Sequence, residues 1–97
     1  MFDASGSMKR KATLAAAEKA TTEQRDKIYG SPDVNFDRIA KGLEIIFDRP
    51  VTKAQVGMVL AMVKLCRLVQ SEDHADSWVD LAGYAACGAE VSNAKEK

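Results

Sequence analysis

Apolar residues between positions 32 and 47 recur at the spacing of an α-helix, and this pattern constrains the fold more than any other feature of the sequence. They fall at i, i+3, i+4, i+7, i+10 and i+11, which gathers them on one helical face. These residues are Phe36, Ile39, Ala40, Leu43, Ile46 and Phe47. No run of alternating β-branched residues is long enough to form a strand. We therefore expect an all-α fold.

Glycine, serine and proline mark the end of the first predicted helix and the start of the second. Gly30 is a natural stop for a first helix over about 9–29, because glycine readily takes the left-handed conformation past a helix end. Ser31-Pro32 then supplies a capping side chain followed by proline at the first helical position. Thr21 and Gln24 have the spacing of a capping box, so the first helix could also break and restart there.

Two further helices follow from the same kinds of signal. Thr52 and Gln55 form a capping-box pattern that predicts a third helix reaching about Val69. After a polar break, Asp76 or Ser77 can cap a fourth helix that reaches about Ala89. The four segments predict a single domain that resembles a four-helix bundle.

The apolar residues of each segment suggest how the helices pack. The third helix carries apolar residues on more than one side, which is typical of a central helix. Gly83 and Gly88 suggest close backbone approach to a neighbouring helix, and Cys66 and Cys87 fit core positions. The core candidates of the first helix are Leu14, Ala17, Ile28 and Tyr29, and those of the fourth are Trp78, Leu81, Ala82, Ala85 and Ala89.

A chain of 97 residues has room for one core. We expect a flexible leader over 1–8, a helical domain over 9–91 and a flexible tail over 92–97, because the two ends are small and polar. Met58 and Met62 stand four positions apart, as in a patch suited to subunit packing. The sequence therefore predicts a homo-oligomer.

Composition narrows the classes of partner. Fourteen basic and fourteen acidic residues give a net charge of zero, which argues against a nucleic-acid-binding protein. The N-terminus lacks the apolar run of a signal peptide or membrane anchor. Two cysteines without metal-ligand spacing suit a reducing compartment, so we expect the cytoplasm of a host cell and no membrane partner.

An acidic row offers one candidate site. Asp73, Asp76 and Asp80 fall at i, i+3 and i+7, on one side of the start of the fourth helix. Such a row can hold a hard divalent cation. Carboxylates near a helix N-terminus are also stabilised by the helix dipole and by capping, without any ligand. Both interpretations stay open.

Basic residues offer a second candidate site. Lys64 and Arg67 share an edge of the third helix, where they could grip a phosphate or form ion pairs with Asp76 or Asp80 across a helical hairpin. Arg25 could add positive charge near the start of the second helix, whose free N–H groups can bind an anion. Tyr29 could stack on a base.

Part of the chain resembles a family of small phage and prophage proteins. The likeness spans residues 25–86 and rests on Arg25-Asp26-Lys27-Ile28-Tyr29-Gly30, Asn35-Phe36, Ile39-Ala40, Val59, Met62-Val63-Lys64, Arg67 and Asp76-Ser77-x-x-Asp80-Leu81-Ala82-Gly83-Tyr84-Ala85. The resemblance implies a phage context and carries no established activity.

A more remote resemblance links the fourth helix to MazG-type all-α nucleotide pyrophosphohydrolases. Those enzymes bind magnesium through a Glu-Glu-x-x-Glu motif on one helix and a Glu-x-x-Asp motif on the next. Asp80 matches the final aspartate, but Ser77 stands three positions before it and the acidic residue is Asp76. The upstream helix has Lys64 and Arg67 where carboxylates are required. The catalytic metal motif is therefore incomplete.

These observations lead to one main functional hypothesis and two alternatives. The main hypothesis is a phage accessory protein that binds, and by binding sequesters, a nucleotide or a nucleotide-derived signal of host defence, without a cofactor. Its site would comprise Arg25, Tyr29, Lys64, Arg67, Asp76 and Asp80. One alternative is a magnesium-dependent pyrophosphohydrolase that uses the three aspartates. The other is a helical module that inhibits a host protein by binding it.

Overall fold

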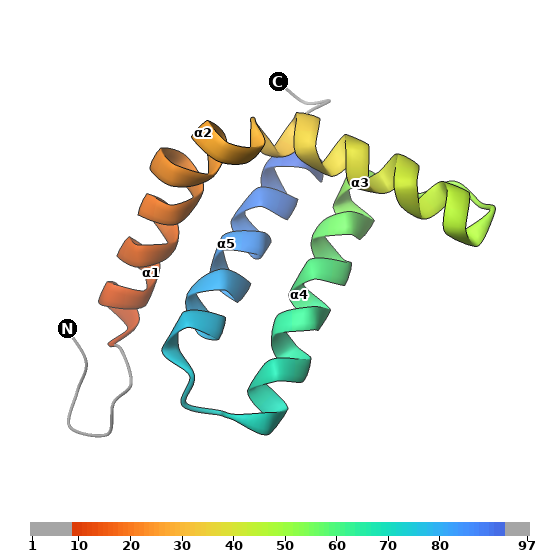
Figure 1. Cartoon of the computed structure of the whole chain (residues 1–97). Coiled ribbons are helices and arrows are strands. Elements are labelled where there is room, and N and C mark those ends of the chain that lie inside the picture. The colour runs from red at the N-terminus through yellow and green to blue at the C-terminus, as the bar shows by residue number, and fades with distance from the viewer. Residues whose placement is uncertain (1–8, 93–97) are drawn as a thin grey trace.

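The computed structural model describes residues 9–92, apart from the side chains of residues 24–26 (Figure 1). Within this range the chain forms one compact helical domain without strands, which confirms the predicted all-α fold. The leader predicted over 1–8 lies outside the described residues, and so does the predicted tail except for Ser92, the last residue of the final helix.

The helices follow one another with short connections. Their bounds are α1 Arg10–Lys19, η1 Ala20–Gln24, α2 Arg25–Tyr29, α3 Pro32–Phe47, α4 Lys53–Gln70 and α5 Ala75–Ser92. The segment η1 is one turn of π-helix that joins α1 to α2 without interrupting the helical path. The predicted first helix therefore comprises α1, η1 and α2.

The predicted break at Thr21 is replaced by this wider turn. The hydroxyl of Thr21 donates to the carbonyl of Ala17 at 2.8 Å, and the hydroxyl of Thr22 donates to the carbonyl of Glu18 at 2.7 Å. These bonds point back into the preceding turn, as Ser and Thr side chains within helices often do. The two threonines therefore stabilise η1, so that α1, η1 and α2 form one continuous helical segment, which we call the α1–η1–α2 rod.

The predicted caps of α3 and α4 are present. Gly30 ends α2 with a φ of 81°, and the Ser31 hydroxyl accepts a hydrogen bond from the Val34 N–H at 3.4 Å. At α4 the capping box is complete, because the Thr52 hydroxyl accepts from the Gln55 N–H and the Gln55 side chain accepts from the Thr52 N–H. Local side-chain chemistry thus sets these two boundaries.

The start of α5 differs from the prediction. The helix begins at Ala75, so Asp76 and Ser77 lie within its first turn and do not cap it. Ser77 is buried, and its hydroxyl oxygen lies 2.7 Å from Nδ1 of His74. The indole N–H of Trp78 donates to the carbonyl of Glu72 at 2.7 Å, which holds this ring at the surface.

The central helix is α5, and the prediction that α4 holds this place is wrong. In Figure 1, α5 lies between α1 and α4, and α3 crosses the ends of α5 and α4. Helix α5 packs against α1, α3 and α4, whereas α4 packs only against α3 and α5 among the described elements. One side of α4 therefore has no helix against it.

The core forms where α3, α4 and α5 meet. Its fully or nearly buried residues are Phe36, Ala40, Val56, Cys87 and Val91, with Ile39, Leu43, Val51, Leu60 and Tyr84 packed around them. Several predicted core residues have 46% or more of their surface exposed. These are Leu14, Ile28, Tyr29, Ile46, Phe47 and Trp78; Cys66, Ala85 and Ala89 are also exposed.

Glycines allow the close approach that the sequence suggested. A Cβ built on Gly57 would lie 3.2 Å from the Cα of Gly88, so α4 and α5 touch backbone to backbone at this point. A Cβ on Gly83 would lie 3.0 Å from the methyl group of Thr21, which brings η1 against α5. Both sides of α5 therefore depend on a residue without a side chain.

Candidate functional site

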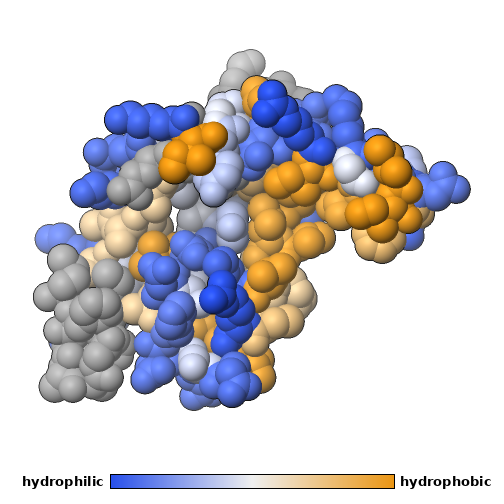
Figure 2. Space-filling model, viewed as in Figure 1, coloured by the Kyte–Doolittle hydropathy of each residue, from blue (hydrophilic) through white to orange (hydrophobic). Residues whose placement is uncertain are grey.

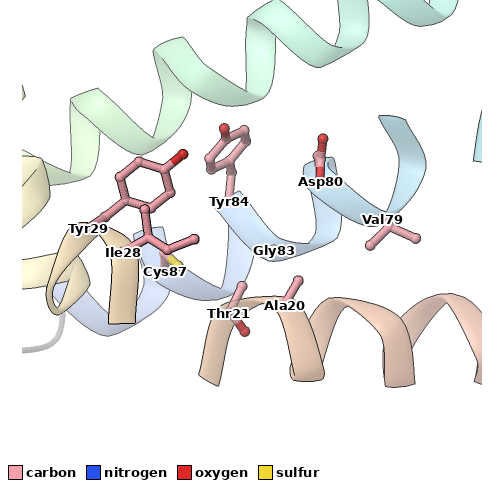
Figure 3. A pocket seen from close by; sticks show the side chains of 9 residues that line it. All are labelled: Ala20, Thr21, Ile28, Tyr29, Val79, Asp80, Gly83, Tyr84 and Cys87. Carbon is pink, nitrogen blue, oxygen red and sulfur yellow. The ribbon is translucent and has the colours of Figure 1, made fainter. Parts of the chain in front are cut away.

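A cavity of about 290 Å³ lies between the α1–η1–α2 rod and α5 (Figure 3). This volume is at the lower end of the range of small-molecule sites, about 300–1,000 Å³. The lining residues are Ala20, Thr21, Ile28, Tyr29, Val79, Asp80, Gly83, Tyr84 and Cys87. Helix packing at Gly83 and the wide turn η1 set the floor of this cavity.

Two tyrosines give the cavity an aromatic wall. Tyr29 is the last residue of α2 and is about half exposed, and Tyr84 is partly buried against the core. Both rings lie along the same side of the cavity in Figure 3, with Asp80 one turn of α5 further along. A flat aromatic group that enters here meets two ring faces or edges, and such contacts are favourable for every nucleobase.

The polar end of the cavity is an ion pair. Nζ of Lys64 on α4 lies 2.8 Å from Oδ2 of Asp80 on α5, and their side chains are 13% and 37% exposed. The antiparallel arrangement of α4 and α5 brings the two residues together, which confirms the pairing that the sequence suggested across a hairpin. The carboxylate is thus held at the cavity edge with a defined orientation.

The remaining predicted site residues lie elsewhere. Arg67 is exposed on α4, where it lines a separate shallow cavity of about 270 Å³. Asp76 is exposed in the first turn of α5 and does not line the tyrosine cavity. Arg25 is the first residue of α2, and its side chain lies outside the described part of the structure. The structure therefore brings together Tyr29, Asp80 and, through the ion pair, Lys64.

The aspartate row does not converge. Asp73 and Asp76 are exposed, whereas Asp80 turns toward Lys64. Among the described residues, no group of three or more histidine, cysteine, aspartate or glutamate side chains is arranged to hold a metal ion. Asp80 instead forms the ion pair with Lys64 that was one of the interpretations of the sequence.

Sequence reasoning missed the aromatic partner of Tyr29. Asp80, Gly83, Tyr84 and Cys87 stand at i, i+3, i+4 and i+7, so they share one face of α5. All four line the cavity. The same periodicity that located the helices could therefore have grouped Tyr84 with Asp80, had the face been read as a cavity wall rather than as a packing surface.

Fold and site define a small all-helical protein with a side cavity next to its central helix. The chain belongs to the family described as Domain of unknown function (DUF6378), which it matches over residues 12–92. None of the described helices is long and apolar enough to cross a membrane.

Two curated relatives come from mycobacteriophages. The chain is 31% identical over 74 residues to the Gene 55 protein of Mycobacterium phage D29, which covers 76% of this chain and 49% of the relative. It is 32% identical over 79 residues to the Gene 55 protein of Mycobacterium phage L5, covering 74% and 47%. The chain thus spans about half the length of these relatives.

These relatives confirm the phage context inferred from the sequence. No solved structure matches the chain. The resemblance to MazG-type pyrophosphohydrolases stays a prediction.

Proposed function

We propose that this chain binds a nucleotide-like small molecule in the cavity between the α1–η1–α2 rod and α5. The observation that carries the proposal is the arrangement of Tyr29, Tyr84 and an oriented Asp80 around a single cavity. Aromatic surface together with one fixed acceptor is what recognition of a flat, N–H-bearing ring requires.

The base would lie against the two tyrosine rings and donate to Asp80. An ionised carboxylate accepts hydrogen bonds only, so it selects rings or sugars that present N–H or O–H groups. Lys64 holds Asp80 in place through the ion pair. This division of roles uses Tyr29 and Asp80 as predicted and adds Tyr84.

Phosphate groups would lie toward Lys64 at the rim of the cavity. An ammonium group has three donors, and the bond to Asp80 uses one of them. Arg25 begins α2, the helix that also carries Tyr29, and is the second candidate. Arg67 and Asp76 do not line this cavity, so the proposal gives them no contact with the base.

Binding without turnover is the form of this function that suits a phage protein. A ligand held in the cavity is withdrawn from solution, and this is how a chain of this kind would sequester a nucleotide signal of host defence. The phage relatives support the context of this proposal. They carry no information on the ligand.

Calorimetric titration with a panel of mononucleotides, dinucleotides and cyclic nucleotides tests the proposal. Tyr29→Ala should weaken binding about 5- to 150-fold, because base stacking on an aromatic residue contributes about 1–3 kcal/mol. Leu14→Ala is the matched control, since Leu14 is also exposed on the rod but does not line the cavity. Recovery of unchanged ligand by chromatography separates sequestration from hydrolysis. A wild-type chain that binds no member of the panel would overturn the proposal.

A further inference from the structure

The outward side of α4 carries seven exposed apolar side chains, and Arg67 borders them. We call this surface the α4 outer face; it consists of Met58, Val59, Met62, Val63, Leu65, Cys66 and Val69. All seven are exposed. Among the six larger side chains, the exposed fraction runs from 42% at Leu65 to 85% at Val69. Solitary exposed apolar residues are ordinary, whereas a contiguous face of this size marks an interaction surface.

The spacing on this face is that of a helix that packs against another helix. Met58, Met62, Leu65 and Val69 follow steps of four, three and four, which places them in one line along α4. Lys64, which could have broken the apolar surface, turns inward to Asp80. The α4 outer face is thus built like the contact stripe of a helical bundle, with the second helix missing.

A second apolar surface adjoins the first at an angle. The far end of α3 extends past α4 in Figure 1 and carries Ile45, Ile46 and Phe47, which are 84%, 70% and 62% exposed. Figure 2 shows apolar surface running along α4 and appearing again at this end of α3. Together they form a corner with one projecting arm. Over the α4 outer face there is a shallow hollow of about 510 Å³, which Arg67 also lines.

The size of the exposed surface matches what a stable dimer needs. A side chain of this size exposes roughly 60–120 Å² when fully accessible, so ten partly exposed ones present several hundred Å². A standard interface takes about 800 Å² from each partner, of which just over half is apolar, or about 450 Å². The two surfaces therefore supply the apolar part of one standard interface.

We infer that a second copy of this chain covers the α4 outer face, with the two copies related by a two-fold axis. A corner with a projecting arm is self-complementary under such an axis, because the α3 end of each copy can lie over α4 of the other. The chain has no net charge that would oppose self-association. The tyrosine cavity lies on the other side of α5, so this inference does not depend on the proposed ligand.

Sedimentation velocity over a range of concentrations tests the inference. The full chain should sediment as a dimer at tens of micromolar, and Met62→Glu should weaken association at least a hundredfold, since a two-fold contact would bury both introduced charges. Leu14→Glu places the same charge on an exposed apolar residue of α1, outside the proposed contact, and should leave the dimer intact. Circular dichroism checks that both variants are folded, and Val69→Glu is the second variant if Met62→Glu does not fold. A monomer at a hundred micromolar, or a dimer that survives both α4 variants, would overturn the inference.

Cysteine cross-linking tests the location of the contact. Cys66 lies on the α4 outer face and is exposed, whereas Cys87 is buried in the core. A flexible bis-maleimide should therefore yield a covalent dimer through Cys66, and Cys66→Ser should abolish it. Reaction at Cys66 without covalent dimers, in a sample that sediments as a dimer, would place the contact elsewhere and refute this assignment.

Discussion

Lys64 and Asp80 hold their charged atoms 2.8 Å apart across the α4–α5 hairpin, and Asp80 also lines the tyrosine cavity. The pair is more enclosed than the ion pair between Lys41 and Asp37, whose side chains are 70% and 46% exposed. Enclosure raises both the Coulomb attraction and the cost of leaving one partner alone. The same contact thus links the stability of the domain to the shape of its candidate site.

Removing Lys64 should destabilise the domain because it leaves Asp80 partly buried without its cation. We expect Lys64→Met to lower the free energy of unfolding by about 1–3 kcal/mol, measured by urea denaturation. The double substitution Lys64→Met with Asp80→Leu should recover part of this loss, since neither charge then remains. Lys41→Met is the exposed control and should have a much smaller effect. Equal losses of stability in Lys64→Met and Lys41→Met would show that solvent screens the Lys64–Asp80 pair as fully as it screens a surface pair.

Two glycines in helices should respond to alanine in opposite directions. At Gly57 the new methyl group would lie 3.2 Å from the Cα of Gly88, so α4 and α5 must separate and stability should fall by about 1–3 kcal/mol. At Gly42, in α3, nothing lies within 4 Å of the new methyl group. There alanine should stabilise the domain by about 0.5–1 kcal/mol through its helix propensity. Thermal denaturation of both variants gives the two signs, and a stabilised Gly57→Ala would contradict the close helix contact.

The ion pair between Lys41 and Asp37 on the surface of α3 should be detectable in the titration of Asp37. The hydrogen bond from Lys41, at 2.6 Å, lowers the pKa of Asp37 below its ordinary value of 3.8. The stabilising contribution of this carboxylate is therefore present above its pKa in the unfolded chain, and it disappears as the pH falls through the lowered pKa of the folded state. Carbon-detected NMR should follow this titration, and Lys41→Met should move the pKa of Asp37 upward. An unchanged pKa in that variant would rule out the hydrogen bond in solution.

Local signals predicted the helix boundaries well because each depends on neighbouring residues. Gly30, Ser31 and the Thr52 capping box act within one turn, so their spacing in the sequence is also their spacing in space. The start of α5 was the exception, where Ala75 opens the helix and the two candidate caps lie inside it. There the polar segment before the helix offered several competing caps.

The arrangement of the helices was harder to predict because it depends on which apolar face finds a partner. Helix α4 was expected at the centre since it is apolar on several sides, but α5 holds that place. Glycine and alanine make α5 narrow, so other elements can approach it closely from several directions. Gly57 of α4 approaches it at Gly88, and Thr21 of η1 approaches it at Gly83. The hydrophobicity of a helix favours its burial, whereas the small size of its side chains decides whether other helices can pack around it.

The candidate site was predicted in part. Tyr29 and Asp80 line the same cavity, and Lys64 joins them through an ion pair that was one of two interpretations of its position. Arg67 and Asp76 share helices with these residues but are exposed and do not line the cavity. Separation along the sequence could not reveal this difference, because it depends on the angle at which α4 and α5 pack.

The π-helical turn at Ala20–Gln24 has a consequence for insertions and deletions in this family. Each residue of a regular α-helix advances by about 100°, so one residue more or less rotates everything on one side of the change. A π-helical turn differs because it holds one residue more than a turn of regular α-helix, so deleting one residue from it would restore regular winding and leave Ala17 and Tyr29 close to the sides they occupy now. The same deletion within α1 or α2 would rotate one end of the rod relative to the other, so this turn is the place in the rod where the loss of one residue should be tolerated best.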